Sequence, residues 1–220
     1  MNILIIAPHR DDEIIGVGGT LLKRKAAGDR IAVCIVTAAE GSEYSPFVKT
    51  VHSEMKAAHE FCGVDQYYGL TFRPNVLENY PRKDMNRELQ DVIQKEKPDE
   101  VYIPFWGDMQ KDHRVVADSA MVVMRAKYAH RPQRIYAYET LSETGINIPT
   151  EATTFIPNVF EDITDYLEAK KKAIGYFKSQ IGDFPDLRSI ESVEVLAKYR
   201  GSTVNTMAAE AFMLVREIKK

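Results

Sequence analysis

Two short segments, far apart in the chain, are rich in side chains that can bind a metal ion or move a proton. The first is PHRDDE at residues 8–13, which directly follows the apolar run 3–7. Two adjacent carboxylates at the end of a buried strand would repel each other unless a cation lay beside them. The same segment has an ordinary interpretation, because Asp11 or Asp12 could cap a following helix. Metal binding and helix capping therefore both remain open here.

The second segment is GDMQKDHR at residues 107–114, which follows the apolar run 101–105 and precedes a helical pattern. In a doubly wound sheet, the first and fourth strands are often neighbours, and ligands bind beyond their carboxyl ends. The two segments would then bring His9, an aspartate and His113 together in one crevice. Two imidazoles and one carboxylate are typical ligands of catalytic zinc, which keeps one position open for water. The two segments together favour a metal site.

The elements that must position these residues alternate up to about residue 140. Short apolar runs predict strands, and runs of helical period that end at Gly or before Pro predict helices. The predicted strands are 3–7, 31–37, 66–70, 101–105 and 135–138, and the predicted helices are 21–27, 49–61, 85–95 and 114–126. This order predicts an α/β, Rossmann-like fold: a mostly parallel sheet with helices on both faces.

The tail differs from the core, because its pattern suggests helices at 162–180, 193–199 and 208–218. We therefore expect one domain over residues 1–220. Its Rossmann-like core would span 1–140, and a C-terminal helical cap, residues 141–220, would pack on that core.

Composition narrows the functional class. The net charge of −3 provides no basic face for nucleic acid. The N-terminal apolar run is too short for a membrane span and lacks the basic region of a signal peptide. Cys34 and Cys62 lie in apolar patterns and are interpreted as small core residues, not as a disulfide or a zinc site. We expect a cytoplasmic protein with a small-molecule substrate and no membrane insertion, and a homo-oligomer remains open.

The two segments resemble the signature of the LmbE-like, or PIG-L, zinc-dependent deacetylases. The sequence APHRDDE at 7–13, with glycines at 16, 18 and 19, is similar to the family's His-Pro-Asp-Asp-Glu motif and its glycine-rich continuation. The sequence DHR at 112–114 is similar to the end of a second motif, His-x-Asp-His. Weaker matches follow in the right order at 37–41, 157–158, 179–180 and 209–212. The resemblance covers most of the chain and implies removal of an acetyl group from an N-acetylated amino sugar or its conjugate, a linear amide.

This resemblance also implies a role for each residue. His9, Asp12 and His113 match the ligands of Zn²⁺, with Fe²⁺ as another suitable ion. Asp11 matches the general base that activates water. The residues that would orient these ligands or contact substrate are Arg10, Glu13, Asp112 and Glu210.

Two positions depart from the family pattern. Arg10 replaces the usual Pro and would place a cation near the rim of the candidate site, where it could bind an anionic group of the substrate. Gln110 stands where the family has the first His of His-x-Asp-His; its amide can donate a hydrogen bond to an oxyanion but cannot transfer a proton. We expect metal binding to survive, and either Asp11 serves as both base and acid or another residue takes the place of the missing acid. The alternative is a catalytically weakened, metal-binding relative that acts as a sugar-binding or regulatory protein.

Other residues have ordinary interpretations. The glycine-rich stretch 16–19 lacks dinucleotide-binding spacing and is expected to pack a helix closely on the sheet. His52 and His59 are expected to be surface or packing residues on one helix face, and lysines 170–172 a solvated stretch. Three residues could line the mouth of the site or be structural: Tyr44, Arg73 and Trp106.

Overall fold

The predicted apolar runs form one mixed β-sheet in the computed structural model, which describes residues 1–38 and 46–219. Its strands are β1 (Asn2–Ala7), β2 (Arg30–Ile35), β3 (Gln66–Gly69), β4 (Glu100–Pro104), β5 (Arg134–Tyr138), β6 (Val159–Asp162) and β7 (Ala209–Glu217). In the described residues the strand order is β3-β2-β1-β4-β5-β7-β6. Strands β1 to β5 run parallel, and β7 runs antiparallel to both β5 and β6. The five strands predicted in the core are confirmed.

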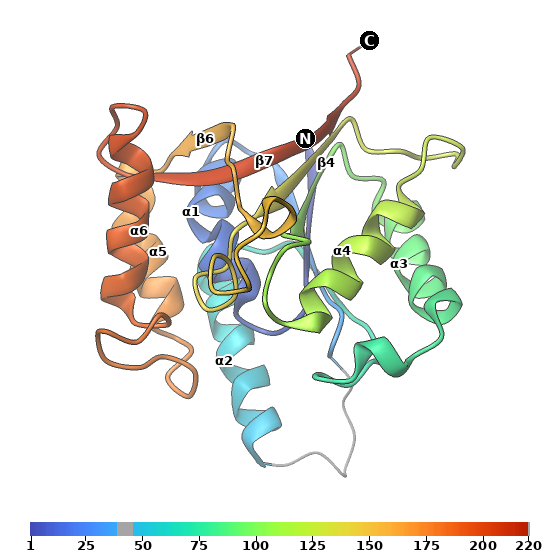
Figure 1. The fold of residues 1–220 in the computed structure, drawn as a ribbon, viewed down its shortest axis with the longest axis horizontal. Helices are drawn as coiled ribbons and strands as arrows, with labels where there is room; N and C mark the ends of the chain where they lie inside the picture. The colour runs from blue at the N-terminus through green and yellow to red at the C-terminus, as the bar shows by residue number, and fades with distance from the viewer. Residues whose placement is uncertain (39–45, 220) are drawn as a thin grey trace.

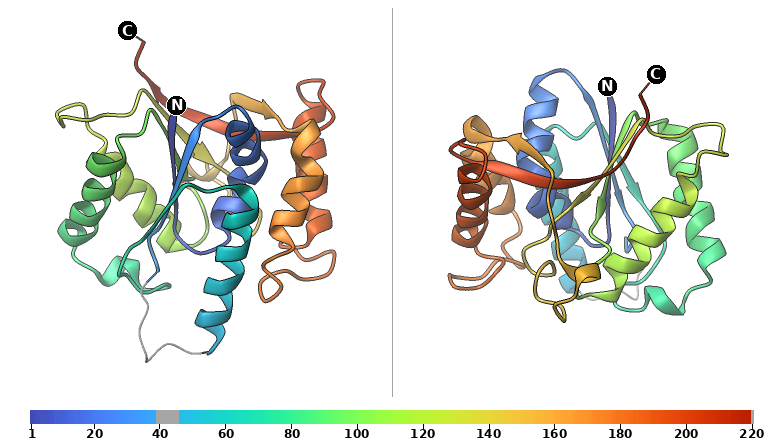
Figure 2. Two further views of the ribbon diagram at one scale, coloured as in Figure 1. Left: turned by 180° about the vertical axis from the view of Figure 1, so that it is seen from behind. Right: turned by 45° about the horizontal axis from the view of Figure 1, so that its top comes forward.

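Helices cover both faces of this sheet (Figures 1 and 2). The α-helices are α1 (Asp12–Ala26), α2 (Pro46–Cys62), α3 (Arg82–Glu96), α4 (Lys111–Val123), α5 (Leu167–Ile174) and α6 (Ile190–Ser202). Three short 3₁₀ turns are η1 (Leu77–Asn79), η2 (Glu151–Thr153) and η3 (Thr164–Tyr166). Within the described ranges, no helix is long and apolar enough to cross a bilayer.

The alternation of side chains along β1 explains why two layers of helices form. Leu4 and Ile6 face the cluster that contains α3 and α4. Ile3 and Ile5 face the opposite cluster, which contains α1 and α2 with residues of α5 and α6. Since successive strand residues point to opposite faces, a strand that is apolar throughout needs a cover on both sides. The two cysteines are buried and unbonded to each other, one in each cluster, as expected.

The strand order places a topological switch point between β1 and β4. The chain moves outward from β1 to β3 on one side and then returns to add β4 and β5 on the other. The register of β1 on β4 pairs Ile5 with Tyr102. Because both strands are parallel, the loops that follow them lie together at one edge of the sheet, where such folds bind ligands. Residues 8–13 and 105–113 form these two loops together with the first turns of α1 and α4.

The predicted helix at 208–218 is wrong, because these residues form the strand β7. The chain there lies between β5 and β6, and both neighbours bond to its backbone. Its Ala, Leu and Met residues favour a helix locally, but pairing on two sides outweighs that preference. The predicted helix at 162–180 is shorter than expected and spans only α5. The cap therefore extends the sheet as well as adding helices.

The lysine stretch 170–172 also differs from expectation, because Lys170 is buried. Its ammonium group donates to Glu210 Oε1 at 2.5 Å and to the carbonyl of Ile15 at 2.7 Å. The carboxylate of Glu210 accepts from the backbone N–H groups of Gly19 and Thr20, both at 2.7 Å. This ion pair bonds to the interior of α1 and so ties the cap to that helix.

The glycine-rich stretch lies inside α1 and packs closely on its neighbours, as predicted. A Cβ atom on Gly16 would overlap the ring of Tyr138 on β5, and one on Gly19 would lie 2.7 Å from Ile163 Cδ1. Both neighbours are fully buried. These two glycines therefore allow a close approach that a side chain would prevent.

We predict that Gly19→Ala lowers the free energy of unfolding by about 1–3 kcal/mol, because overpacking a buried contact forces neighbours to move. The matched control is Gly18→Ala, whose Cβ would lie 3.2 Å from the side chain of Ile14. There the higher helix propensity of Ala, about 1 kcal/mol, offsets most of the crowding. Urea denaturation of both variants measures the difference, and equal stability of the two would contradict this packing.

Candidate metal centre

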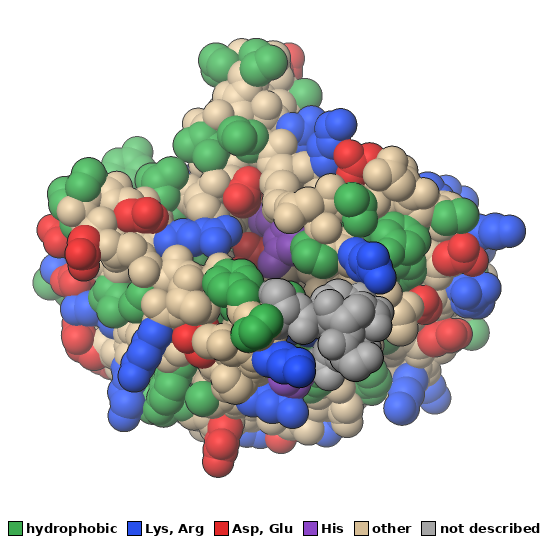
Figure 3. Space-filling view, turned by 90° about the horizontal axis from the view of Figure 1, so that it is seen from below, with side chains coloured by type: hydrophobic (Ala, Val, Ile, Leu, Met, Phe, Trp, Pro, Cys, Tyr) green, Lys and Arg blue, Asp and Glu red, His purple; other side chains and the backbone are tan. Residues whose placement is uncertain are grey.

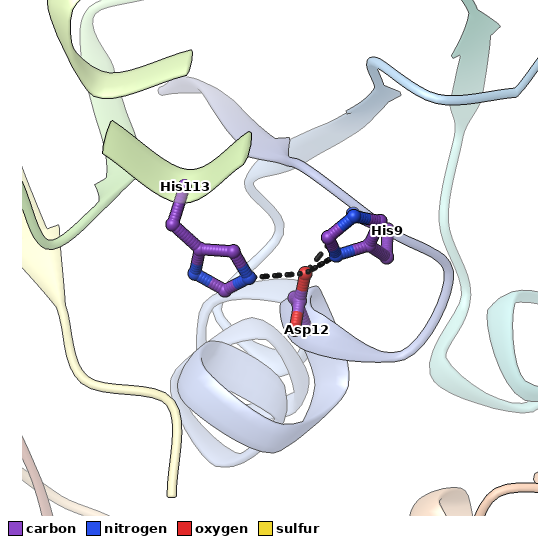
Figure 4. Close-up of side chains that lie close together, drawn as sticks. All are labelled: His9, Asp12 and His113. Atoms are coloured by element: carbon purple, nitrogen blue, oxygen red, sulfur yellow. Dashed lines mark hydrogen bonds and ion pairs between the residues drawn. The ribbon is translucent and has the colours of Figure 1, made fainter. Parts of the chain in front are cut away.

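His9, Asp12 and His113 meet at the switch point, and Figure 4 shows the two imidazoles on either side of the carboxylate. One ligand atom of each residue lies within 4.8 Å of the others. His9 Nδ1 and His113 Nε2 are each 3.3 Å from Asp12 Oδ2. The loop after β1 supplies His9, the start of α1 supplies Asp12, and the first turn of α4 supplies His113. The three side chains that were predicted to converge do so.

These residues fit a divalent metal ion. Asp12 Oδ1 and His113 Nε2 are buried and have no hydrogen-bond partner among residues 1–38 and 46–219. Buried polar atoms without a partner are uncommon and cost stability, so each of them needs an explanation. Imidazole nitrogen and carboxylate oxygen together suit Zn²⁺ and also Fe²⁺. An ion placed between them would satisfy both atoms.

A buried carboxylate fixes the imidazole of His113. Its Nδ1 lies 2.8 Å from Asp108 Oδ2, which leaves Nε2 turned towards Asp12. The other oxygen of Asp108 accepts a hydrogen bond from the Thr144 hydroxyl at 2.5 Å. A histidine that binds a metal usually donates its second N–H to such a carboxylate, which sets its tautomer. Asp108 is this carboxylate for His113, a role that was not predicted from the sequence.

Asp112 lies against the other histidine. Its Oδ2 is 3.0 Å from His9 Nε2, and the same carboxylate accepts from the backbone N–H groups of Asn75 and Leu77 at 2.6 and 3.2 Å. Asp112 therefore links the imidazole of His9 to the loop before η1. Each histidine thus has a separate carboxylate that fixes its orientation.

The charges of the cluster are tightly linked. Burial alone would raise the pKa of Asp12, but His113 and His9 outweigh it and hold that pKa far below its usual range. Burial opposes the charge on His9, yet hydrogen bonds to Asp112 and Asp12 raise its pKa to about 9. The pKa of His113 rises to about 10 for similar reasons, with Asp12 as the largest favourable cause. At neutral pH the metal-free cluster is therefore a carboxylate between two protonated imidazoles.

Asp11 has an unusual backbone conformation. Its φ of 134° and ψ of −31° lie where residues other than Gly are rarely found, at a cost of about 1–3 kcal/mol. Its N–H donates to Glu13 Oε2 at 3.1 Å, and its carbonyl accepts from the N–H groups of Ile14 and Ile15. Within the described chain the Asp11 side chain makes no capping hydrogen bond to α1, although it stands at the N-cap position. The capping interpretation is therefore not supported for Asp11.

The carboxyl group of Asp11 is buried beside the cluster. Burial and the neighbouring charge of Asp12 raise its pKa to about 8, whereas Arg188 acts in the opposite direction. Arg188 Nη1 lies 3.7 Å from Asp11 Oδ2. A carboxyl group in this condition can hold or release a proton near neutral pH, as a general base requires.

A pocket of about 220 Å³ opens beside His9 and Asp11. Figure 3 shows histidine at the floor of a hollow on this face, with acidic and basic side chains beside it. The walls of the pocket include three amide side chains and an apolar patch, namely Asn75, Gln110, Gln180, Phe47 and Val51. The three amides lie on three different segments of the chain. The pocket therefore offers hydrogen-bonding groups around one apolar surface.

The two positions that depart from the family pattern both line this pocket. Gln110 Nε2 donates to Asn75 Oδ1 at 2.7 Å, so one wall amide fixes another. Arg10 is buried at 8% exposure, and its Nη2 donates to the carbonyl of Ala38 at 3.1 Å. Arg10 thus lines the pocket and also ties its loop to the chain beyond β2.

Several other predicted residues lie away from the pocket. The carboxylate of Glu210 bonds to α1 and Lys170 and is not among the residues that line this pocket. Trp106 is 37% exposed and packs against Phe105. Tyr44 and residues 39–41 of the weaker family matches lie outside the described residues.

Sequence reasoning missed four residues of this site. Asp108 had a signal, since it follows a buried strand and precedes His113 by five positions. His59 was expected to be a surface or packing residue; it is a buried packing residue, and its hydrogen bond to Glu13 was not predicted. Burial raises the pKa of Glu143, which lies within electrostatic reach of His113. Arg188 and Glu143 come from irregular segments, where no periodic pattern could identify them.

Known proteins that are similar in sequence to this chain are described as deacetylases. The family model described as PIG-L: GlcNAc-PI de-N-acetylase matches residues 4–124. A protein of Escherichia coli K12, described as uncharacterized deacetylase YaiS, is 29% identical over 184 residues, which are 81% of this chain and 91% of that protein. Diacetylchitobiose deacetylase of Thermococcus kodakarensis is 29% identical over 199 residues, which are 84% and 71% of the two chains.

The fold has close counterparts among solved structures. The conserved protein TT1542 from Thermus thermophilus superposes with a TM-score of 0.81 at 23% identity, covering 100% of this chain and 97% of that one. This likeness supports the α/β fold. The family match spans more than half of the 220 residues and contains both segments that supply His9, Asp12 and His113. The chain therefore belongs to the PIG-L family of de-N-acetylases, hydrolases that act on amides.

Proposed function

We propose that this protein is a zinc-dependent deacetylase that hydrolyses the acetamide of an N-acetylated amino sugar or its conjugate. The observation that carries the proposal is the cluster of His9, Asp12 and His113 beside the buried carboxyl of Asp11, at the floor of a pocket. The substrate class is supported by the family description and by the name of the relative from Thermococcus kodakarensis. The substrate would be a small molecule.

Under this proposal His9, Asp12 and His113 hold the ion. A bound Zn²⁺ supplies a Lewis acid for the amide carbonyl and lowers the pKa of water, and Fe²⁺ would serve similarly. Asp108 and Asp112 keep the two imidazoles in the required orientation. Such fixed ligands leave little to reorganise during the reaction.

Asp11 moves the proton. Its carboxylate takes a proton from the attacking water as oxygen adds to the amide carbon. It then gives that proton to the nitrogen as the C–N bond breaks, which leaves acetic acid and a free amine, and the acid loses its remaining proton to solvent to give acetate. Gln110 cannot supply a proton, so one residue serves both steps. The pKa of Asp11, about 8 in the metal-free protein because of burial and of Asp12, suits both roles.

The pocket walls suit a sugar. Gln110 keeps one amide hydrogen after its bond to Asn75, and this hydrogen can donate to the developing oxyanion. The amides of Asn75 and Gln180 can bond to sugar hydroxyls, and Phe47 and Val51 offer an apolar surface to a pyranose face. Substrate orientation would therefore come from several weak contacts around one fixed reactive centre.

Replacing the base should separate metal binding from turnover. We predict that Asp11→Asn binds one zinc ion per chain but loses about 10²–10⁴-fold in kcat, the usual contribution of general acid–base catalysis. Acetate release from a panel of N-acetylglucosamine, N,N′-diacetylchitobiose and an inositol-linked N-acetylglucosamine measures the loss. The matched control is Asp118→Asn, an exposed carboxylate on α4, which should keep wild-type activity.

Stoichiometric zinc with no hydrolysis of any substrate in the panel would contradict the enzyme proposal. That outcome would favour the alternative, a metal-binding relative that acts as a sugar-binding or regulatory protein.

Zinc binding should release protons. The pKa values of His9 and His113, about 9 and 10, exceed the ordinary value of 6.5. Both rings are therefore in the imidazolium form at pH 7, and each loses one proton when the ion binds. The carboxyl group of Asp11 could release a third proton, so the measurement uses Asp11→Asn. In this variant we predict about two protons released per zinc at pH 7. The zinc affinity should rise with pH up to about 9 and level off above 10. Calorimetry in buffers of different ionisation enthalpy measures the protons, and release below about half a proton would contradict the cluster.

A further inference from the structure

A histidine outside the metal cluster lies next to the catalytic loop. His59 is on the face of α2 that packs against the sheet and is 6% exposed. Its Nε2 is 2.7 Å from Glu13 Oε1, and Glu13 is fully buried. Because a carboxylate only accepts hydrogen bonds, the imidazole donates here. His59 therefore gives a buried carboxylate one of the partners that burial demands.

The other oxygen of Glu13 acts on the backbone of Asp11. Glu13 Oε2 accepts the Asp11 N–H at 3.1 Å, on the N-terminal side of the residue whose φ is 134°. On its C-terminal side, the Asp11 carbonyl is held by the first turn of α1. A disfavoured backbone conformation persists only where the surroundings hold it from several directions. Glu13 supplies one of these restraints.

We infer that His59 is a positioning residue for Asp11 and acts through Glu13. The inference rests on the proposed function, because it assigns to His59 the role of orienting the general base Asp11. His59 fixes the carboxylate of Glu13, that carboxylate holds the Asp11 N–H, and the held backbone directs the Asp11 carboxyl group towards the cluster. Residues Asp11 and Glu13 belong to the motif of the family, whereas His59 lies on a separate helix, 46 positions from Glu13 along the chain.

Loss of His59 should affect the base and spare the metal ligands. Without the imidazole, Glu13 keeps a buried oxygen with one donor fewer, so its carboxylate can turn away from Asp11. The backbone of Asp11 can then relax, and its carboxyl group is no longer held in its orientation towards the cluster. Asp12 has its own restraint, since its Oδ2 accepts the backbone N–H of His9 at 3.0 Å. The effect should therefore appear in kcat and not in zinc affinity.

The experiment compares three variants of the full-length, zinc-loaded protein. His59→Leu removes the donor, and we expect kcat to fall about 10- to 100-fold, the usual effect of removing a residue that supports a metal site. KM and the zinc Kd should stay within about threefold of wild type. His59→Gln keeps an N–H donor and should restore kcat to within about fivefold. His52→Leu is the matched control, since His52 is on the same helix and its ring, like that of His59, lies beside Tyr67.

A second measurement does not depend on turnover. Amide hydrogen exchange at Asp11, followed by NMR, should be at least about tenfold faster in His59→Leu and close to wild type in His59→Gln, because only the former frees Glu13. An unchanged kcat in His59→Leu, or an equal loss in His59→Gln, would overturn the inference. If the wild-type protein releases no acetate, the proposed function fails, and the exchange rate of the Asp11 amide then decides this inference alone.

Discussion

The parallel pairing of β1 with β4 is the constraint on which the candidate site depends, since it joins two segments about a hundred residues apart. Strand β1 ends shortly before His9 and Asp12, and strand β4 ends shortly before Asp108 and His113. After Asn2 and Glu100 both strands are apolar and buried, so they must be covered on both faces, which fixes their place at the centre of the sheet. Their polar continuations consequently meet at one edge, where the strand order reverses.

This edge concentrates buried acidic groups, and all of those discussed above except Asp11 and Glu143 have a close counterpart. Asp12 lies between two imidazoles, Asp108 holds His113, and Glu13 is held by His59. Asp11 stands apart, because the guanidinium of Arg188 is 3.7 Å away and its conformation is strained. Buried charge without close compensation is costly, and it is commonly retained at sites where proton transfer is required. The residue with the weakest compensation is also the one to which we assign the chemistry.

Much of the core and the convergence of His9, Asp12 and His113 could be predicted from the sequence, because the core follows from local patterns and the three residues follow from the strand order and the family motif. Apolar runs marked the central strands, and the position of His113 after such a run brought it to His9. The helix predicted at 208–218 failed, since strand pairing there is decided by β5 and β6 and not by the local sequence. The roles of His59 and Arg188 could not be predicted, because a lone histidine on α2 and an arginine in an irregular loop acquire their partners only in the folded chain.

The most direct test of the central claim is the coordination of a single zinc ion, measured by X-ray absorption at the zinc edge on protein loaded with one equivalent. His9, Asp12 and His113 predict a shell of nitrogen and oxygen at about 2.0–2.2 Å with two imidazoles, and His113→Ala should leave one. A sulfur shell at about 2.3 Å, or two imidazoles retained in His113→Ala, would contradict it.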